Sequence, residues 1–454
     1  MPDSIEIQPS GPLRAKIRPP GSKSVTNRAL VCAALARGES LLTGALESDD
    51  TGVMIEGLRQ LGVAIDHDRS AKTIRVTGCD GRPPAASADL TLGNSGTTVR
   101  FLTAMATLGH GVYRLDGTRR MRERPIQDLL DALRQLGADA VSVSGSGCPP
   151  VVVHAGGLPG GEAEVAGNIS SQFLSAMLQA APCAASDVVL AVRGELVSKP
   201  YVAMTLAVMR SFGVETLAQD RASRMGILPG ECGLANAYQI PAGDFSLRVP
   251  APQSYQGRSY VIEPDASAAS YFFAAAAIAG GNVTVEGLSR RSLQGDVAFC
   301  DCLRQMGCEV VDGDDQITVE GKPLRGIDVD MNAISDTVQT LAAVALFAQG
   351  STTIRNVGHI RHKETDRIAA LAAELRKFGA EVEEKADGLR ITPQPLHGAT
   401  IDTYDDHRMA MSMALVGLVV PGVIIRDPHC TAKTYPEFFS DLACLSRGSA
   451  AITG

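Results

Sequence analysis

A helical pattern that ends in an apolar residue and a glycine recurs along this chain, and an alternating apolar and polar stretch follows it. The five copies end at Gly62, Gly137, Gly213, Gly307 and Gly379. Subtracting these numbers gives spacings of 75, 76, 94 and 72 residues. Glycine readily adopts the left-handed conformation that ends many helices, and strict alternation is typical of a β-hairpin. Residues 445–448 (LSRG), 69 residues after Gly379, are interpreted as a degenerate sixth copy.

A second series of short, Ala-rich helical patterns interleaves with the first. They begin near Ser24, Gly96, Ser170, Asp265, Asp336 and Asp406. Because a helix that is apolar on every face is buried, each of six repeats is predicted to contain a buried helix, a strand, an amphipathic helix and a hairpin. The low aromatic content, 4% with no Trp, favours close helix packing through Ala and Gly.

The repeats also predict how many domains the chain forms. Six repeats of about 75 residues exceed a single hydrophobic core, so we expect two domains of three repeats each. The longest spacing falls between repeats three and four, where a stretch with Pro and Gly, about residues 218–257, is interpreted as an insertion. The domain boundary is predicted at the end of this stretch, near Tyr260.

Composition excludes several classes of partner. The net charge of −8 argues against nucleic acid or an anionic membrane surface as a partner, because both require a dominant basic field. The N-terminus has neither a basic segment nor an apolar one, and no apolar run reaches membrane-spanning length, so we expect a cytoplasmic protein. The ten cysteines are scattered, several of them in apolar helix patterns, which suits reduced core thiols. No His clusters near Cys300, Cys302 and Cys308, so no metal site is expected there.

The densest run of charge covers residues 361–367 (RHKETDR), which open a helical pattern. Lys and Arg at the start of a helix oppose the helix dipole, and an anionic ligand would remove this conflict. Glu364 could then transfer a proton beside that anion. The alternative is a solvated helix start in which Glu364 and Arg367 form an i,i+3 pair.

Other helix starts carry similar groups. Residues 21–24 (GSKS) with Arg28 place a Lys and hydroxyls where helix N–H groups are free, and residues 93–97 (GNSGT) form a glycine-lined turn. Four arginines, Arg119, Arg120, Arg122 and Arg124, crowd one short loop, which suggests an anion. Residues 170–172 and 198–201 add neutral donors, with N-capping as the alternative.

Two aspartates in the second half are candidate general bases. Asp336 and Asp406 stand at predicted helix starts, where an Asp is ordinarily a cap. Cations accompany them, since Arg408 follows Asp406 and Lys433 lies further along the chain. A carboxylate placed among cations and against a substrate hydroxyl can accept its proton.

Eight ordered motifs resemble the family of 5-enolpyruvylshikimate-3-phosphate synthases, over about residues 7–440. They are GSKS with NR at 21–28, GNSGT at 93–97, RERP at 122–125, SSQ at 170–172, SKPY at 198–201, KETDR at 363–367, DDHRM at 405–409 and CTAKT at 430–434. The resemblance implies an α/β (α+β) enolpyruvyl transferase fold, with six βαβαββ repeats arranged as two inverse α/β barrels, three per domain. One domain would comprise residues 1–21 plus 261–454, and the other residues 22–260.

The implied reaction transfers the enolpyruvyl group of phosphoenolpyruvate to the 5-hydroxyl of shikimate 3-phosphate and releases phosphate, without metal or cofactor. It belongs to the shikimate pathway to aromatic amino acids, and glyphosate competes with phosphoenolpyruvate in this family. We expect a monomer that acts on these two small molecules and binds neither nucleic acid nor membrane.

The resemblance also implies residue roles by matching position. Asp336 would be the base on the 5-hydroxyl, while Glu364, helped by Lys23, would protonate the methylene carbon. Shikimate 3-phosphate would be held by Lys23, Ser24, Arg28, Ser170, Ser171, Gln172, Ser198, Tyr201, Asp336 and Lys363. Phosphoenolpyruvate would be held by Lys23, Asn94, Gly96, Arg124, Gln172, Arg367, Arg408 and Lys433.

Departures from the family pattern leave alternatives open. His359 stands where some members have a substrate-contacting Asn, and Val99 and Phe101 flank Arg100 where many members read Ala-Met-Arg-Pro. The sister enzyme that acts on UDP-N-acetylglucosamine shares the architecture, but its loop cysteine is missing between Gly109 and Pro125 here. An inactive scaffold that binds phosphorylated metabolites is a further alternative.

Overall fold

The computed structural model describes residues 3–220, 226–227, 240–446 and 452–453. The chain divides into two compact units. Unit 1 contains Met1–Pro20 and Glu263–Gly454, and unit 2 contains Gly21–Ile262. The domain boundaries expected from the sequence, after residues 21 and 260, stay a prediction.

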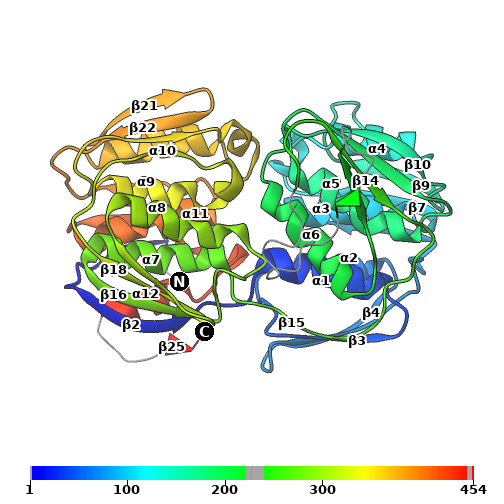
Figure 1. The fold of residues 1–454 in the computed structure, drawn as a ribbon, viewed down its shortest axis with the longest axis horizontal. Coiled ribbons are helices and arrows are strands. Elements are labelled where there is room, and N and C mark those ends of the chain that lie inside the picture. Colours follow the sequence, from blue (N-terminus) through cyan, green and yellow to red (C-terminus); the bar gives the residue numbers. More distant parts are fainter. Residues whose placement is uncertain (1–2, 221–225, 228–239, 447–451, 454) are drawn as a thin grey trace. The chain divides into compact units, whose positions relative to one another are not determined.

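Unit 2 contains three sheets, in each of which a parallel pair of strands is followed by antiparallel strands (Figure 1). The first has the order β15 (Ser259–Val261), β3 (Glu39–Thr43), β5 (Thr73–Thr77) and β4 (Ala64–Asp68). The second has the order β6 (Ser87–Thr91), β7 (His110–Asp116), β9 (Val151–Gly156) and β8 (Asp139–Ser142). The third has the order β10 (Gly161–Ala166), β11 (Val188–Arg193), β14 (Phe245–Val249), β12 (Leu217–Asp220) and β13 (Gly226–Ile227).

Six α-helices accompany these sheets in the described part of unit 2. The Ala-rich helices are α1 (Lys23–Leu35), α3 (Gly96–Ala106) and α5 (Ser171–Ala180), and nearly all of their residues are buried. The amphipathic helices α2 (Asp49–Gln60) and α4 (Gln127–Gln135) bury one face, whereas α6 (Lys199–Ser211) buries the consecutive residues Met204–Met209. The core of unit 2 therefore forms where the apolar helices meet the inner faces of the sheets.

Unit 1 follows the same plan. Its first sheet has the order β17 (Glu309–Asp312), β18 (Gln316–Gly321), β16 (Gly281–Glu286), β2 (Leu13–Arg18) and β25 (Ile452–Thr453). The second has the order β19 (Asp328–Asp330), β20 (Thr352–Arg355), β22 (Gly388–Thr392) and β21 (Glu381–Lys385). The third has the order β1 (Ser4–Ile7), β24 (Val423–Arg426) and β23 (Thr400–Ile401). Its buried helices are α7 (Ala266–Ala279), α9 (Val338–Ala345) and α11 (His407–Ala414). The helices α8 (Phe299–Met306), α10 (Arg367–Lys377) and α12 (Phe438–Ser446) complete the unit.

The structure confirms the repeats that the sequence predicts. Each of the five repeat glycines has a positive φ, between 87° at Gly137 and 115° at Gly307, so each ends its helix in the left-handed region. Antiparallel hairpins follow four of these glycines directly. After Gly213, β12 pairs with β14 and with β13. Part of the proposed sixth copy, residues 447–448, lies outside the described residues.

The predicted mixed α/β architecture is likewise confirmed, although its sheets are discrete. In the described parts of both units the strands form six sheets of three to five strands, and none closes into a continuous hydrogen-bonded barrel. Within the stretch interpreted as an insertion, residues 245–249 form β14, which lies between β11 and β12 in its sheet. Residues 221–225 and 228–239 of that stretch lie outside the described residues.

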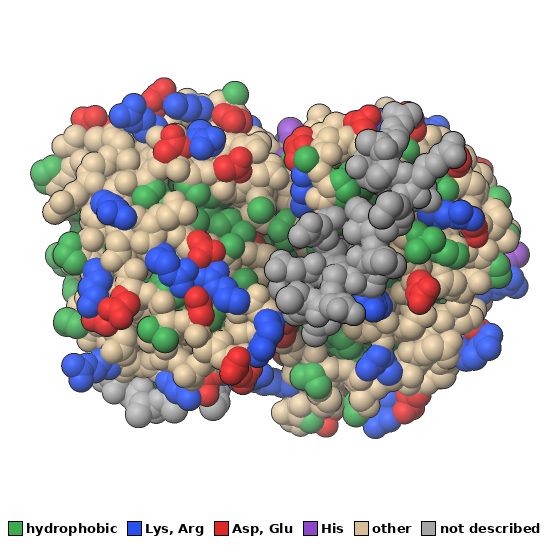
Figure 2. Space-filling model, in the orientation of Figure 1, with side chains coloured by type: hydrophobic (Ala, Val, Ile, Leu, Met, Phe, Trp, Pro, Cys, Tyr) green, Lys and Arg blue, Asp and Glu red, His purple; other side chains and the backbone are tan. Residues whose placement is uncertain are grey.

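The surface has no dominant sign of charge on the face that Figure 2 shows. Lys and Arg side chains lie among Asp and Glu side chains there. In the parts of the chain for which coordinates are described, no helix has the length and apolar character needed to cross a membrane.

Candidate active site

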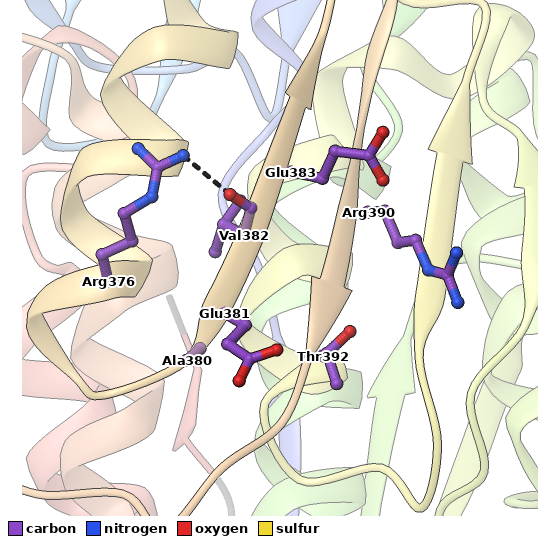
Figure 3. Close-up of a pocket in the computed structure, with 7 residues that line it drawn as sticks. All are labelled: Arg376, Ala380, Glu381, Val382, Glu383, Arg390 and Thr392. Carbon is purple, nitrogen blue, oxygen red and sulfur yellow. Dashed lines mark hydrogen bonds between the residues drawn. The ribbon is translucent and has the colours of Figure 1, made fainter.

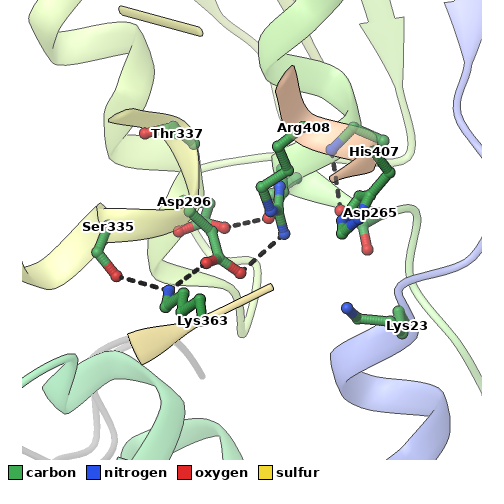
Figure 4. Close-up of polar contacts among 12 residues, drawn as sticks. Lys23, Asp265, Asp296, Ser335, Thr337, Lys363, His407 and Arg408 are labelled. Atoms are coloured by element: carbon green, nitrogen blue, oxygen red, sulfur yellow. Dashed lines mark hydrogen bonds and ion pairs between the residues drawn. The ribbon is translucent and has the colours of Figure 1, made fainter. Parts of the chain in front are cut away.

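A cluster of opposite charges surrounds Asp336 in unit 1. Asp336 lies in the 3-10 helix η5 (Asn332–Thr337), directly before α9. Its carboxylate lies 2.5 Å from Lys363 Nζ, 2.7 Å from Arg408 Nη2 and 3.4 Å from Arg367 Nη1. Lys363 also lies 3.2 Å from the hydroxyl of Ser335, and Figure 4 shows Lys363, Ser335 and Arg408 around this position. One carboxylate is therefore held by three cations, as expected of a site that binds anions.

Arg367 connects this carboxylate to two others. Its guanidinium donates to Asp406 at 2.7 and 3.2 Å and to Glu364 at 2.8 Å, and the residue is 1% exposed. Lys433 Nζ lies 3.3 Å from the other oxygen of Glu364. Burial opposes the charge of Arg367, but Asp406, Glu364 and Asp336 together raise its pKa above the usual value. The i,i+3 pair of Glu364 and Arg367 is thus confirmed as one contact of a larger buried network.

The charged run that the sequence places at a helix start divides between two elements. Residues Gly358–His362 form a 3-10 helix, and α10 begins only at Arg367. Asp366 is the N-cap, and its carboxylate accepts from the backbone N–H of Ala369 at 3.1 Å. The expectation of several cations within the first helical turn is therefore wrong, because Arg367 alone among the run's Lys and Arg residues lies in α10. Its charge is offset by Asp406 and Glu364.

The capping alternative applies to one of the two candidate bases. Asp406 caps α11, since its side chain accepts from the backbone N–H of Arg408 at 2.9 Å. For Asp336 the position differs: α9 begins at Val338, and its N-cap residue is Thr337, which makes no side-chain cap bond. The structure thus confirms that Asp336 stands at a helix start, and its carboxylate is directed to Lys363 and Arg408.

A second cluster lies in unit 2, where its buried helices begin. Lys23 is the first residue of α1 and lies 3.3 Å from Asp50, with both side chains largely buried. Arg124 donates to the backbone oxygen of Asn94 at 3.1 Å and to its side-chain oxygen at 3.2 Å. Near the start of α3, Arg100 donates to Gln172 at 2.6 Å. The motifs at 21–24, 93–97 and 170–172 thus each contribute groups at helix starts within one unit.

Arg28 binds protein groups in the structure. Its guanidinium donates to Thr205 at 2.7 Å, to the backbone oxygen of Ser24 at 2.9 Å and to that of Tyr201 at 3.2 Å. It also lies over the rings of Phe101 and Tyr201. Burial lowers the pKa of Arg28 to about 10. These contacts connect α1 to α6, so Arg28 has a structural role in unit 2.

The loop of four arginines needs no anion to balance most of its charge. Arg122 forms two hydrogen bonds to Asp116, at 2.9 and 2.8 Å, and Arg119 and Arg120 pair with Glu123. The expectation that the whole loop requires an anion is therefore wrong for these three residues. Arg124 instead donates to the backbone and side-chain oxygens of Asn94, both uncharged.

Sequence reasoning missed three residues beside these clusters. Asp50 pairs with Lys23, Arg100 bridges Gln172 and the backbone oxygen of Pro125, and Asp296 lies buried near Asp336. Arg100 stands one helical turn after Gly96 of the motif at 93–97, so a search of adjacent turns could have found it. Asp50 lies in α2, a different helix from that of Lys23, and no local pattern marks it. Asp296 lies 40 residues before Asp336 by subtraction, and no local pattern marks it.

The structure also contains a cavity that the motif residues do not line. A cavity of about 670 Å³ lies against α10, β21 and β22, and Arg376, Glu381, Glu383 and Arg390 are among its lining residues (Figure 3). The guanidinium of Arg376 donates a hydrogen bond to the backbone oxygen of Val382, at 2.7 Å. Among the described residues, no group of three or more His, Cys, Asp or Glu side chains could hold a metal ion.

His359 should stay neutral in the folded protein at pH values where an ordinary histidine is charged. Burial lowers its pKa to about 3, and the nearby Lys363 acts in the same direction. We expect its ring resonances to stay constant from pH 8 to 5 in an NMR titration, whereas histidines of the urea-unfolded chain titrate near about 6.5. A folded-state midpoint for His359 near pH 6 would contradict this expectation.

The same shift predicts an effect on stability. Below about pH 6.5, His359 binds a proton in the unfolded chain but not in the folded chain. Acidification therefore favours unfolding. In His359→Gln, the free energy of unfolding should therefore fall less between pH 6.5 and 5 than in the unchanged protein.

Comparison with solved structures shows the class of fold. The chain is similar to two structures of EPSP synthase from Acinetobacter baumannii, with TM-scores of 0.77 and 0.76, sequence identities of 24% and 23%, and coverage of 97% of this chain and 98% of each structure. The chain therefore has the enolpyruvyl transferase fold.

Sequence comparison then shows the family. The sequence model of one protein family, EPSP synthase (3-phosphoshikimate 1-carboxyvinyltransferase), matches residues 7–248 and 243–442. A 3-phosphoshikimate 1-carboxyvinyltransferase from Nostoc punctiforme is 48% identical over 440 residues, which cover 96% of this chain and 98% of that protein. One from a Shewanella species is 47% identical over 443 residues, 97% of this chain and 99% of that protein. The chain belongs to the EPSP synthase family.

Proposed function

We infer that the chain transfers the enolpyruvyl group of phosphoenolpyruvate to the 5-hydroxyl of shikimate 3-phosphate, giving 5-enolpyruvylshikimate 3-phosphate and phosphate. Family membership supports this reaction. The main structural support is the position of Asp336, whose carboxylate contacts Lys363, Arg367 and Arg408. This arrangement places a potential base beside three groups that can bind anions. The reaction is a step of the shikimate pathway to aromatic amino acids.

For the first half of the reaction we propose proton transfers at two carboxyl groups. Asp336 would accept the proton of the 5-hydroxyl as its oxygen attacks the C2 carbon of phosphoenolpyruvate. Glu364 would donate a proton to the C3 methylene carbon, so the adduct gains as many protons at carbon as it loses at oxygen. The buried Arg367 contacts both carboxylates and supports this pairing of roles.

In the second half, Glu364, now ionised, would take a proton from C3 while phosphate leaves C2 with the proton that Asp336 accepted, and the double bond would be restored. Arg408 and Lys433 are proposed to neutralise charge on phosphoenolpyruvate, since each lies beside one of the two carboxylates. Lys23 is proposed to assist Glu364, and the remaining substrate-binding residues are those implied by the family resemblance. The expected monomeric state and cytoplasmic location stay proposals, and sedimentation equilibrium would test the first.

A phosphate-release assay tests the function. With shikimate 3-phosphate and phosphoenolpyruvate together, we expect stoichiometric phosphate and 5-enolpyruvylshikimate 3-phosphate, with no added metal. Release of phosphate with UDP-N-acetylglucosamine in place of shikimate 3-phosphate would favour the sister enzyme. No release with either acceptor, by protein that binds both ligands, would indicate the inactive scaffold.

Gly96→Ala should weaken inhibition by glyphosate and raise the KM for phosphoenolpyruvate. A Cβ atom at position 96 would lie 2.7 Å from Cζ of Arg124 and 2.8 Å from Nη1 of Arg100, closer than side-chain atoms tolerate. Arg124 must therefore move away from its position beside Asn94. Steady-state kinetics with glyphosate as competitor measures both effects.

A matched control for this prediction is Gly52→Ala in α2. A Cβ atom there would meet nothing within 4 Å, so kinetics and inhibition should be unchanged. Equal inhibition of Gly96→Ala and the unchanged protein would refute the steric explanation.

A further inference from the structure

Asp296 is a buried carboxyl group to which the proposed reaction assigns no role. It lies in the 3-10 helix η4 (Gly295–Ala298) of unit 1 and is 4% exposed. The preceding residue fixes this segment: Gln294 accepts from the backbone N–H of Ala266 at 2.9 Å and donates to the backbone oxygen of Pro264 at 2.6 Å. The start of α7 therefore holds the chain so that Asp296 remains inside the unit.

The charged and polar neighbours of Asp296 come from several elements. Ser267 of α7 donates a hydrogen bond to its carboxylate, Asp265 precedes that helix, Asp336 lies on η5, and Arg408 lies on α11. η4 also packs against α8, whose charged residues Asp301 and Arg304 pair with each other at 2.6 Å. Figure 4 shows Asp296 in the same cluster as Arg408 and Lys363.

This environment places the titration of Asp296 near neutral pH. Burial raises its pKa to about 6, and the like charge of Asp336 acts in the same direction, whereas Ser267 and Arg408 oppose the shift. Asp296 is therefore mostly ionised at pH 7.5 and mostly protonated at pH 5. Its charge changes within the range in which most enzymes are assayed.

The charge on Asp296 affects the proposed base. Lys363, Arg367 and Arg408 all stabilise ionised Asp336, which makes this carboxylate a weaker proton acceptor. A second negative charge nearby acts against them. It partly neutralises Arg408, which lies 2.7 Å from Asp336, and it raises the proton affinity of Asp336.

We propose that Asp296 is a positioning residue for the enolpyruvyl transfer: its buried carboxylate, acting through Arg408 and Asp336, keeps Asp336 basic enough to accept the 5-hydroxyl proton. Asp296 itself is not proposed to touch substrate. The inference rests on the proposed function, because it assumes that Asp336 is the base.

Asp296→Asn tests this role with nearly unchanged shape. At pH 7.5 we expect kcat to fall about tenfold, the effect of lowering the pKa of a general base by about one unit. The KM for phosphoenolpyruvate should not rise, since removing a negative charge leaves the cations more available. The acidic limb of the kcat/KM profile, expected near pH 6 in the unchanged protein, should be lost.

Ser267→Ala provides a second, independent readout. The Ser267 hydrogen bond lowers the pKa of Asp296, so its removal should move the acidic limb to higher pH without abolishing it. If Asp296→Asn fails to fold, this variant carries the test. The control is Asp441→Asn, which alters another buried carboxylate of unit 1, one that accepts from Tyr435 at 2.6 Å. Its kcat and pH profile should match those of the unchanged protein.

The outcomes separate this inference from the function on which it rests. An unchanged protein that releases no phosphate from the two substrates would overturn the proposed function. An active unchanged protein, together with a folded Asp296→Asn variant of equal kcat and identical acidic limb, would overturn the role of Asp296. Equal loss of kcat in Asp296→Asn and Asp441→Asn would also overturn it, because the effect would then be general to buried carboxylates.

Discussion

Asp336→Ala is expected to lower kcat at least about 100-fold, the low end for removal of a positioned acid or base. The variant removes the proposed proton acceptor for the 5-hydroxyl and leaves Lys363, Arg367 and Arg408 without their shared carboxylate. Because these cations remain, the KM for phosphoenolpyruvate should stay constant or fall. Steady-state kinetics at saturating shikimate 3-phosphate, with circular dichroism to check folding, measures the effect.

Asp314→Ala is the matched control for this change. Asp314 also belongs to unit 1, but its side chain is 94% exposed and pairs with the exposed Arg291. Its replacement should leave kcat within experimental error. A loss below tenfold in folded Asp336→Ala would contradict the assignment of Asp336 as the base.

Arg367→Ala should lower the free energy of unfolding by about 3–5 kcal/mol, as expected when one partner of a buried ion pair is removed. Arg367 is 1% exposed and contacts the carboxylates of Asp406, Glu364 and Asp336. Without Arg367, less positive charge would offset these three carboxylates inside the unit. Urea unfolding followed by circular dichroism gives the change.

Arg291→Ala separates this effect from a general loss of arginine. Arg291 pairs with Asp314 at 2.9 Å on the surface, and such exposed pairs contribute about 0–1 kcal/mol. Its replacement should therefore change stability little. If Arg367→Ala and Arg291→Ala destabilised equally, the buried network around Arg367 would not stabilise the folded state as argued.

The fold was predictable where local pattern alone decides it. The Ala-rich runs were apolar on every side, so burial of α1 and α7 followed without any knowledge of their partners. The repeat glycines required only the local conformation of a helix end. The charged run at 361–367 was also visible, because its residues are adjacent in sequence.

The site was less predictable because its charge pairs join residues far apart in sequence. Arg367 pairs with Asp406 and Arg408 with Asp336, so the balance of each charge depends on tertiary packing. Local reasoning therefore overestimated the unbalanced charge in the arginine loop, where Asp116 neutralises Arg122. It also left N-capping open as the role of Asp336, whereas Thr337 is the N-cap residue of α9 and Asp336 pairs with Arg408 from a distant part of the sequence.

The pairing of β1 with β24 determines when β1 can fold during synthesis of the chain. Ser4–Ile7 are synthesised long before their hydrogen-bonding partners, Val423–Arg426. Unit 2 is continuous from Gly21 to Ile262, so all of its sequence exists before the second part of unit 1 is synthesised. Because domains generally fold as units during synthesis, unit 2 should fold first. β2 can pair with β16 once Gly281–Glu286 have been synthesised, whereas β1 stays unpaired until Val423–Arg426 have left the ribosome.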